Sequence, residues 1–215
     1  MIERILPDGV VAAELFDDPA DVELFPEEEA HIAEAVDKRR REFTSGRHCA
    51  RTALAKLGFP HVPVPPGERG SPIWPPGVVG SITHCAGYRA AAVSLDVLSV
   101  GIDAEPYLPL PPGVLDAISL REERVMLAAL GGDLHWDRVL FSAKESVYKA
   151  WFPLARRWLN FEDALIRIDG DGAFAASLLV SGPSVDGRML TGFAGRWTVA
   201  GGIIATSVTV PRDPG

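Results

Sequence analysis

Two proline-rich segments limit what this chain can fold into. The first is PHVPVPPGERGSPIWPPG at residues 60–77, and the second is YLPLPPG at residues 107–113. Proline has no backbone N–H and a fixed φ, so neither segment can form a helix or a central strand. The chain must therefore fold as helices and strands that are separated by these two irregular connections.

Helical patterns precede the first connection and follow the second. Residues 26–58 begin with a proline and three glutamates and end at Gly58, which are typical start and stop signals. We expect Gly46 to break this stretch in two. Residues 114–130 predict a further helix, and residues 141–152 predict another that Pro153 closes.

Short strands follow each helical part. The segments 88–94 and 99–104 predict a hairpin across a turn at residues 95–98. The other expected strands are residues 78–83, 164–168, 174–180, 196–199 and 203–210. Because helices precede strands in each half, we expect an α/β (α+β) fold with two similar halves, residues 1–102 and 103–215.

Composition excludes several classes of protein. Of the 215 residues, 47% are apolar, which is enough for a packed core. A net charge of −8 argues against general nucleic-acid binding but allows a phosphorylated small molecule in a local basic cluster. The sequence shows no apolar run of about 18 residues and no signal peptide, so we expect a cytoplasmic protein without a membrane span.

The segment VGIDAEP at residues 100–106 is an apolar strand that ends in two carboxylates. Residues i and i+2 of a strand point to the same face, so Asp103 and Glu105 project together. At roughly 5 Å they repel by about 3 kcal/mol at an effective dielectric near 20. Either both lie in water at a strand end, or a hard divalent ion such as Mg²⁺ binds them.

A second charged element is the helix FSAKESVYKAWF at residues 141–152. Glu145 and Lys149 are four residues apart and share one helix face, beside an apolar stripe. In one interpretation they form an ordinary exposed ion pair. In the other, Glu145 is a third carboxylate for the metal ion, and Lys144 and Lys149 bind phosphate.

Basic residues concentrate in the first helical region. The run KRRR at residues 38–41 is followed by Arg47 and Arg51, which share a face because they are four residues apart. This face is either solvated or an anion site. Arg69, in the segment GERGSP, could reach over such an anion, and Gly70 would let the backbone approach it.

Histidine and cysteine patterns are less specific. His84 follows the predicted strand VVGSIT and is either a structural group or a donor to a phosphate oxygen. The dipeptide His-Cys occurs at residues 48–49 and 84–85, but adjacent residues rarely face one ion and no C-x₂-C spacing supports zinc. Nothing in the spacing supports a Cys–His nucleophile, and neither a G-x-S-x-G elbow nor a P-loop occurs.

Taken together and in order, five stretches resemble a known family. The chain resembles the Sfp-type 4′-phosphopantetheinyl transferases, and most of all the actinobacterial subgroup that activates carrier proteins of fatty-acid, polyketide and nonribosomal-peptide biosynthesis. The stretches that carry the resemblance are KRRREFTSGRHCARTAL, RGSPIWPPGVVGSITHCAGYRAA, VGIDAEP, LHWDRVLFSAKESVYKAWFPL and RWLNFEDA.

The resemblance implies a fold, a reaction and roles for individual residues. The two halves would pack with the site between them, and the enzyme would move the phosphopantetheine arm of coenzyme A to a carrier-protein serine, releasing adenosine 3′,5′-bisphosphate. The metal, Mg²⁺ or alternatively Mn²⁺, would be bound by Asp103, Glu105 and Glu145. Coenzyme A would be bound by Arg39, Arg47, Arg69, Gly70, Thr83, His84, Lys144 and Lys149. Glu145 is the candidate base, and Lys144 or Lys149 would stabilise the leaving group.

The expected partners are coenzyme A and acyl, peptidyl and polyketide carrier proteins, with no nucleic acid and no membrane, and we expect a monomer. The alternative is a non-catalytic module on the same fold that binds coenzyme A or a carrier protein. The complete trio of Asp103, Glu105 and Glu145 favours an enzyme, because a binding module has no need of all three.

Overall fold

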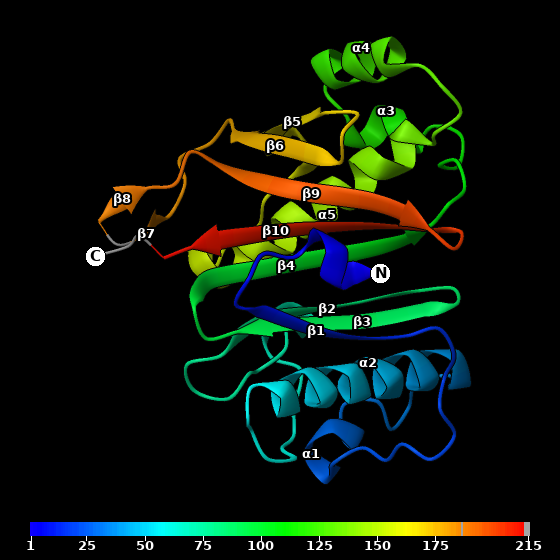
Figure 1. The fold of residues 1–215 in the computed structure, drawn as a ribbon, viewed down its shortest axis with the longest axis vertical. Coiled ribbons are helices and arrows are strands. Elements are labelled where there is room, and N and C mark those ends of the chain that lie inside the picture. The colour runs from blue at the N-terminus through cyan, green and yellow to red at the C-terminus, as the bar shows by residue number, and fades with distance from the viewer. Residues whose placement is uncertain (186, 213–215) are drawn as a thin grey trace.

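The computed structural model describes residues 1–185 and 187–212. Two antiparallel sheets lie side by side and form the centre of the molecule (Figure 1). In spatial order, the three-stranded sheet consists of β1 (Val10–Leu15), β3 (Tyr88–Ser94) and β2 (Val79–Cys85). In spatial order, the five-stranded sheet consists of β4 (Val97–Pro106), β10 (Ile203–Pro211), β9 (Gly192–Ala200), β6 (Ala173–Leu178) and β5 (Ala164–Ile168). A short hairpin is formed by β7 (Ser184–Val185) and β8 (Arg188–Met189).

Each sheet has its own long helix. In Figure 1, α2 lies below the three-stranded sheet, whereas α5 lies behind the five-stranded sheet. The helices are α1 (Pro26–Glu29), α2 (Asp37–Lys56), α3 (Val114–Ile118), α4 (Arg121–Leu130) and α5 (Trp136–Ala155), with 3₁₀ turns η1 (Ile2–Ile5), η2 (Glu68–Gly70) and η3 (Phe161–Asp163). None of the described helices combines the length and the apolar character that crossing a membrane requires.

The two sheets meet where β2 lies beside β4. The Ser81 hydroxyl accepts a hydrogen bond from the Ile102 amide at 3.1 Å, and the Thr83 hydroxyl accepts one from the Ala104 amide at 2.9 Å. Side chains therefore satisfy amides on the edge of β4 that faces away from β10. The expected division after residue 102 falls inside β4, the strand along which the sheets join.

The predicted hairpin between β3 and β4 is wrong. β3 pairs with β1 on one edge and with β2 on the other, so it has no edge left for β4. β4 instead pairs with β10 in the other sheet, with Asp103 opposite Thr206. The general expectation of a mixed α/β fold with antiparallel strands is confirmed.

Three helix boundaries differ from those expected. Gly46 lies inside α2 and does not break it, because the break falls earlier, between α1 and α2. The single helix expected at residues 114–130 is divided by Ser119, which has extended backbone dihedrals. Pro153 lies inside the last turn of α5, which ends at Ala155 and is capped by Arg156, whose φ is +52°.

A buried glutamate organises the N-terminal half. Glu28 is fully buried, and its carboxylate accepts hydrogen bonds from the Phe25 amide at 3.0 Å and from the Val64 amide at 2.8 Å. The same carboxylate pairs with Arg51 of α2 at 2.8 Å. One side chain thus caps α1, fixes the chain after α2, and neutralises a cation on α2.

Glu123 repeats this arrangement in the C-terminal half. It is fully buried and accepts hydrogen bonds from the Leu120 amide at 2.8 Å and from the Ile166 amide at 2.7 Å. It pairs with Lys144 of α5 at 2.9 Å. Glu28 and Glu123 thus each cap a helix, accept a bond from a distant backbone amide and pair with a cation on the long helix of their half. This correspondence supports the expected similarity of the two halves.

Gly101 lets α5 pack closely against β4. A Cβ atom at this position would lie 2.0 Å from the Ser146 carbonyl oxygen, which no side chain can occupy. The Ser99 hydroxyl donates to the Ala150 carbonyl at 2.7 Å on the same contact. The close approach brings Asp103, two residues beyond Gly101, against the face of α5.

Candidate active site

Asp103 is the best connected carboxylate at the junction of the sheets. It is 5% exposed, and Lys149 of α5 donates to its Oδ1 at 2.7 Å. Ser142, also on α5, donates to Oδ2 at 2.9 Å, and the Thr83 hydroxyl lies 3.4 Å from Oδ1. β2, β4 and α5 therefore all contribute to holding this one carboxylate.

Glu105 lies two residues further along β4. Arg138, in the first turn of α5, pairs with its Oε2 at 2.9 Å. Burial and the neighbouring charge of Asp103 raise the pKa of Glu105 to about 6, although Arg138 acts in the opposite direction. A further positive charge near Glu105 would stabilise its ionised form, which burial and Asp103 destabilise.

Glu145 has no hydrogen-bond or ion-pair partner among the described residues. Burial raises the pKa of Glu145, the charge of Asp103 raises it further, and Lys149 opposes both effects. The side chain lines two cavities, of about 170 Å³ and 660 Å³. Glu145 is therefore a carboxylate with raised proton affinity that faces open space.

These carboxylates do not form a finished metal site in their present positions. Among residues 1–185 and 187–212, no three His, Cys, Asp or Glu side chains converge as a ready ligand group. The donor set nevertheless fits a hard divalent cation, because Asp103 raises the pKa of both Glu105 and Glu145 and all three offer oxygen ligands. Two protein cations currently occupy this space, Lys149 at Asp103 and Arg138 at Glu105.

His84 lies on the basic side of the junction. Its Nε2 is 3.2 Å from an Arg39 nitrogen, and its Nδ1 is 3.7 Å from Glu42. Burial lowers the pKa of His84, Glu42 opposes this, and the charges of Arg39 and Lys149 lower it further. Since the Arg39 guanidinium can only donate, Nε2 accepts and Nδ1 carries the proton.

A cavity of about 520 Å³ opens beside His84, and Arg39, Arg47 and Gly70 line it as well. The Arg47 guanidinium stacks over Phe43 at 4.0 Å from the ring centroid. Its Nε donates to the Val64 carbonyl at 2.6 Å, and burial lowers the pKa of Arg47 to about 10. Three of the predicted basic residues, Arg39, Arg47 and His84, therefore meet at one cavity within an acidic protein.

The first proline-rich segment contacts the C-terminal half of the molecule through Arg69. Arg69 has a φ of +54°, and its guanidinium lies 5.3 Å from the ring centroid of Trp158. Arg69 and Gly70 line the cavity of about 660 Å³ together with Lys149 and Tyr148. The buried Tyr148 hydroxyl has no hydrogen-bond partner within the described part of the chain, so it is available to a ligand.

Lys144 lines the cavity of about 170 Å³ together with Glu145, but its ammonium group is bonded inside the C-terminal half. Its side chain is 3% exposed, and Nζ donates to Glu123 and to the carbonyls of Phe161 at 2.6 Å and Ala164 at 3.2 Å. Its charge is already neutralised inside the C-terminal half. The placement argues against the phosphate contact that the sequence suggested, and favours the structural role that Arg51 has in the other half.

Sequence reasoning missed two residues that contact the carboxylates. Arg138 and Ser142 contact Glu105 and Asp103, respectively. On α5, the four polar positions 138, 142, 145 and 149 are spaced by four, three and four residues, which places them on one face. This periodicity was present in the sequence and could have identified both.

Two family models match most of this chain. Residues 27–94 match the model of the 4′-phosphopantetheinyl transferase N-terminal domain. Residues 99–199 match the model of the 4′-phosphopantetheinyl transferase superfamily. The first match ends with β3 and the second begins inside β4, so the two matches are separated by residues 95–98.

Full-length relatives agree with these matches. The chain is 53% identical to 4′-phosphopantetheinyl transferase Npt of Nocardia iowensis, over 97% of this chain and 99% of the relative. It is 52% identical to 4′-phosphopantetheinyl transferase Svp of Streptomyces mobaraensis, over 100% of this chain and 91% of the relative. It is 49% identical to PptT of Mycobacterium tuberculosis, over 98% of both. The chain belongs to the 4′-phosphopantetheinyl transferase superfamily, within its actinobacterial Sfp-type subgroup.

Proposed function

We propose that this chain transfers the 4′-phosphopantetheine arm of coenzyme A to a serine of apo carrier proteins and releases adenosine 3′,5′-bisphosphate. The full-length similarity to named transferases supports the reaction. The observation that carries the proposal is structural: the charge of Asp103 raises the pKa of both Glu105 and Glu145, and Glu145 lines a cavity together with Arg69 and Lys149.

The nucleotide part of coenzyme A requires positive charge. It carries roughly four negative charges near neutral pH, while the protein has a net charge of −8. Arg39 and Arg47 line the cavity of about 520 Å³, and Arg69 reaches the adjoining one. We assign the 3′-phosphate to these arginines and the diphosphate to the end of the cavity at His84.

The metal assignment rests on the chemistry of the donor set. Asp103, Glu105 and Glu145 would hold Mg²⁺ or Mn²⁺, which when bound neutralises charge on the diphosphate. Lys149 Nζ pairs with Asp103 Oδ1 at 2.7 Å. Lys149 is then the side chain that can leave Asp103 and stabilise charge on the departing bisphosphate.

The remaining step is proton removal from the carrier-protein serine, which is a poor nucleophile near neutral pH. The serine oxygen forms a bond to the phosphorus that bears the pantetheine arm, and the bond from this phosphorus to the bisphosphate oxygen breaks. Glu145 accepts the serine proton, because its raised pKa makes it a stronger base than an exposed glutamate. Neutral His84 can reorient its donor nitrogen toward a phosphate oxygen.

The pantetheine arm needs an apolar wall and partners for its amides. The cavity of about 170 Å³ beside Glu145 is lined by Tyr148, Trp158 and Leu159. The unpartnered hydroxyl of Tyr148 supplies a hydrogen bond that a bare apolar channel would lack. We therefore assign the arm to the space beside Tyr148.

Intact-protein mass spectrometry tests this function. Purified protein, coenzyme A, Mg²⁺ and an apo carrier protein should yield a carrier protein heavier by one phosphopantetheine. A complex without any mass gain would instead support the non-catalytic binding module. Turnover of nucleotides that lack the pantetheine arm would support a different phosphoryl-transfer enzyme.

A further inference from the structure

Arg138 uses all three of its guanidinium nitrogens in one compact contact. NH1 donates to Glu105 at 2.9 Å, Nε donates to the Leu108 carbonyl at 3.0 Å, and NH2 donates to the Pro109 carbonyl at 3.0 Å. The Arg138 side chain is 15% exposed and that of Glu105 is 19% exposed. The pair is thus partly shielded from water, where an ion pair is stronger than on an open surface.

The loop that Arg138 contacts is the second proline-rich segment. Asp137, the neighbour of Arg138, accepts a hydrogen bond from the Leu110 amide at 2.7 Å. Two consecutive residues of α5 therefore fix the backbone of residues 107–113. On the outer side of this loop, Leu108 is 60% exposed.

Glu105 depends on Arg138 more than Asp103 depends on Lys149. Asp103 would still have Ser142 and Thr83 if Lys149 moved away. Among the described residues, Arg138 is the one side chain bonded to the Glu105 carboxylate. The position of Glu105 is therefore set by the same guanidinium that holds the loop.

We propose that Arg138 is a positioning residue that links cation binding at Glu105 to the conformation of the loop at residues 107–113. This inference rests on the proposed function, because it takes Glu105 as a ligand of the cation. Arg138 and a divalent cation compete for one carboxylate. A planar guanidinium holds its three acceptors in one plane, so the loss of Glu105 also loosens its hold on Leu108 and Pro109.

The first experiment measures Mn²⁺ binding alone, without coenzyme A, from the free Mn²⁺ signal in electron paramagnetic resonance. The measurement is made near pH 8.5, where the carboxyl groups are ionised. Arg138→Gln removes the competing charge, so Mn²⁺ should bind roughly tenfold more tightly than to the wild type. Arg138→Lys keeps the charge and should bind Mn²⁺ as the wild type does.

Arg40 offers a matched control in the other half. It lies in the first turn of α2, pairs with Glu29, and donates to the Ile32 carbonyl at 2.8 Å. The variant Arg40→Gln thus removes an arginine with the same kinds of contact, but one whose partners are Glu29 and Ile32 and not Asp103, Glu105 or Glu145. Its Mn²⁺ affinity should equal that of the wild type.

The second experiment follows amide hydrogen exchange in residues 107–113. Mn²⁺ should speed exchange of the Leu110 amide in the wild type. When Arg138 releases the Leu108 and Pro109 carbonyls, the bond from this amide to Asp137 becomes the remaining hydrogen bond that these two α5 residues make to the loop. In Arg138→Gln the exchange should be fast from the start and should not respond to Mn²⁺. Arg138→Lys should already exchange faster than the wild type, since one ammonium group cannot bond both carbonyls and Glu105 in the same plane.

The outcomes separate this inference from the function on which it rests. Equal Mn²⁺ affinity in wild type and Arg138→Gln, or a wild-type loop that does not respond to Mn²⁺, overturns the link while leaving the transferase intact. A wild type that transfers phosphopantetheine but binds no Mn²⁺ overturns the metal assignment and the link together. If Arg138→Gln does not fold, the variant Arg138→Lys tests the link instead. Exchange of its Leu110 amide at the wild-type rate would overturn the link.

Discussion

Lys149 Nζ lies 2.7 Å from Asp103 Oδ1, and this pair joins the central helix of the C-terminal half to the strand at the sheet junction. Lys149, which we assign to the leaving group, is therefore paired with Asp103, which we assign to the metal ion. The ion pair holds the two side chains in a fixed orientation relative to each other.

Replacing Lys149 should affect the chemical step. In Lys149→Gln, no ammonium group is available for the departing bisphosphate, so kcat should fall roughly 10²-fold or more. Single-turnover assays with saturating coenzyme A and carrier protein measure this loss directly. A variant with an unchanged single-turnover rate would remove Lys149 from the mechanism.

Lys144, although adjacent to Glu145, should affect stability instead. Lys144→Met leaves the fully buried Glu123 without its cation, which should lower the free energy of unfolding by about 3–5 kcal/mol. Urea denaturation measures the change. Arg51→Met, the matching change at Glu28, should cost a similar amount. A stable Lys144→Met protein with a collapsed single-turnover rate would restore the catalytic role that its burial argues against.

The contact between Gly101 and α5 should also be needed for stability. In Gly101→Ala, the new methyl group would meet the Ser146 carbonyl, so α5 must move away from β4 and stability should fall by about 1–3 kcal/mol. Gly170→Ala is the control, because nothing lies within 4 Å of its Cβ position and its φ is not in the left-handed region. The midpoint temperature of thermal unfolding should therefore be lower in Gly101→Ala than in the wild type and nearly unchanged in Gly170→Ala.

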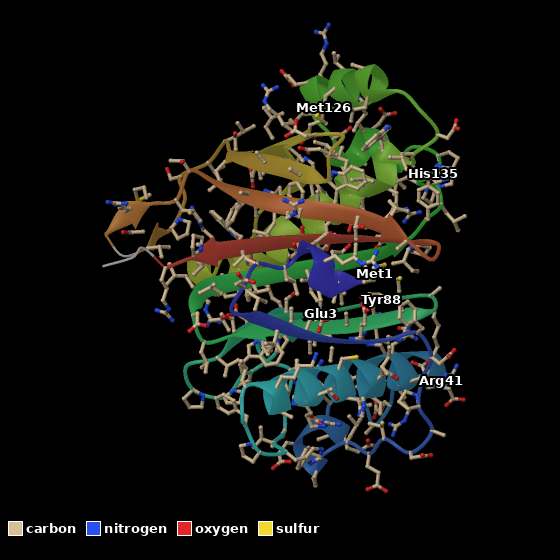
Figure 2. All side chains as sticks on the ribbon, in the orientation of Figure 1. Met1, Glu3, Arg41, Tyr88, Met126 and His135 are labelled. Carbon is tan, nitrogen blue, oxygen red and sulfur yellow. The ribbon has the colours of Figure 1, made fainter. Side chains whose placement is uncertain are left out.

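Glu14 should make stability depend on acid pH. Burial alone would raise the pKa of Glu14, but hydrogen bonds from the terminal amine of Met1 and from the Tyr88 hydroxyl lower it below its ordinary value. Figure 2 shows Met1 and Tyr88 at the boundary between the sheets. A lowered folded-state pKa gives stability that is complete above the unfolded-state pKa, near 4.3, and is lost as the pH falls through the folded-state value.

The variant Glu14→Gln checks this assignment. Its free energy of unfolding should be lower than that of the wild type at neutral pH, and the difference should shrink as the pH falls below about 4. Urea denaturation across this pH range gives both curves. Parallel curves would show that Glu14 does not contribute to the pH dependence.

The sequence predicted local features well, because they depend on neighbouring residues. The strand that carries Asp103 and Glu105 was expected, and so was the helix face shared by Glu145 and Lys149. Both follow from periodicities of two and about 3.6 residues. The roles assigned to these residues remain proposals.

Relations between distant segments could not be predicted in the same way. The β3–β4 hairpin was expected from a short turn, but β1, a strand the sequence did not reveal, occupies the edge that β4 would need. Helical spacing gives the face on which Lys144 lies but not the buried Glu123 that it meets there. Arg138 and Glu105 are separated along the chain by the second proline-rich segment, so only the folded structure shows them as a pair.

The central claim is that acids from β4 and α5 act together to move phosphopantetheine. The most direct measurement is the single-turnover rate of carrier-protein modification, read by intact mass, for wild type, Glu105→Gln and Glu145→Gln at saturating Mg²⁺ and coenzyme A. We expect the wild type to add one phosphopantetheine and each amide variant to react at least roughly 10²-fold more slowly while remaining folded. Full-rate modification by either variant would contradict the claim.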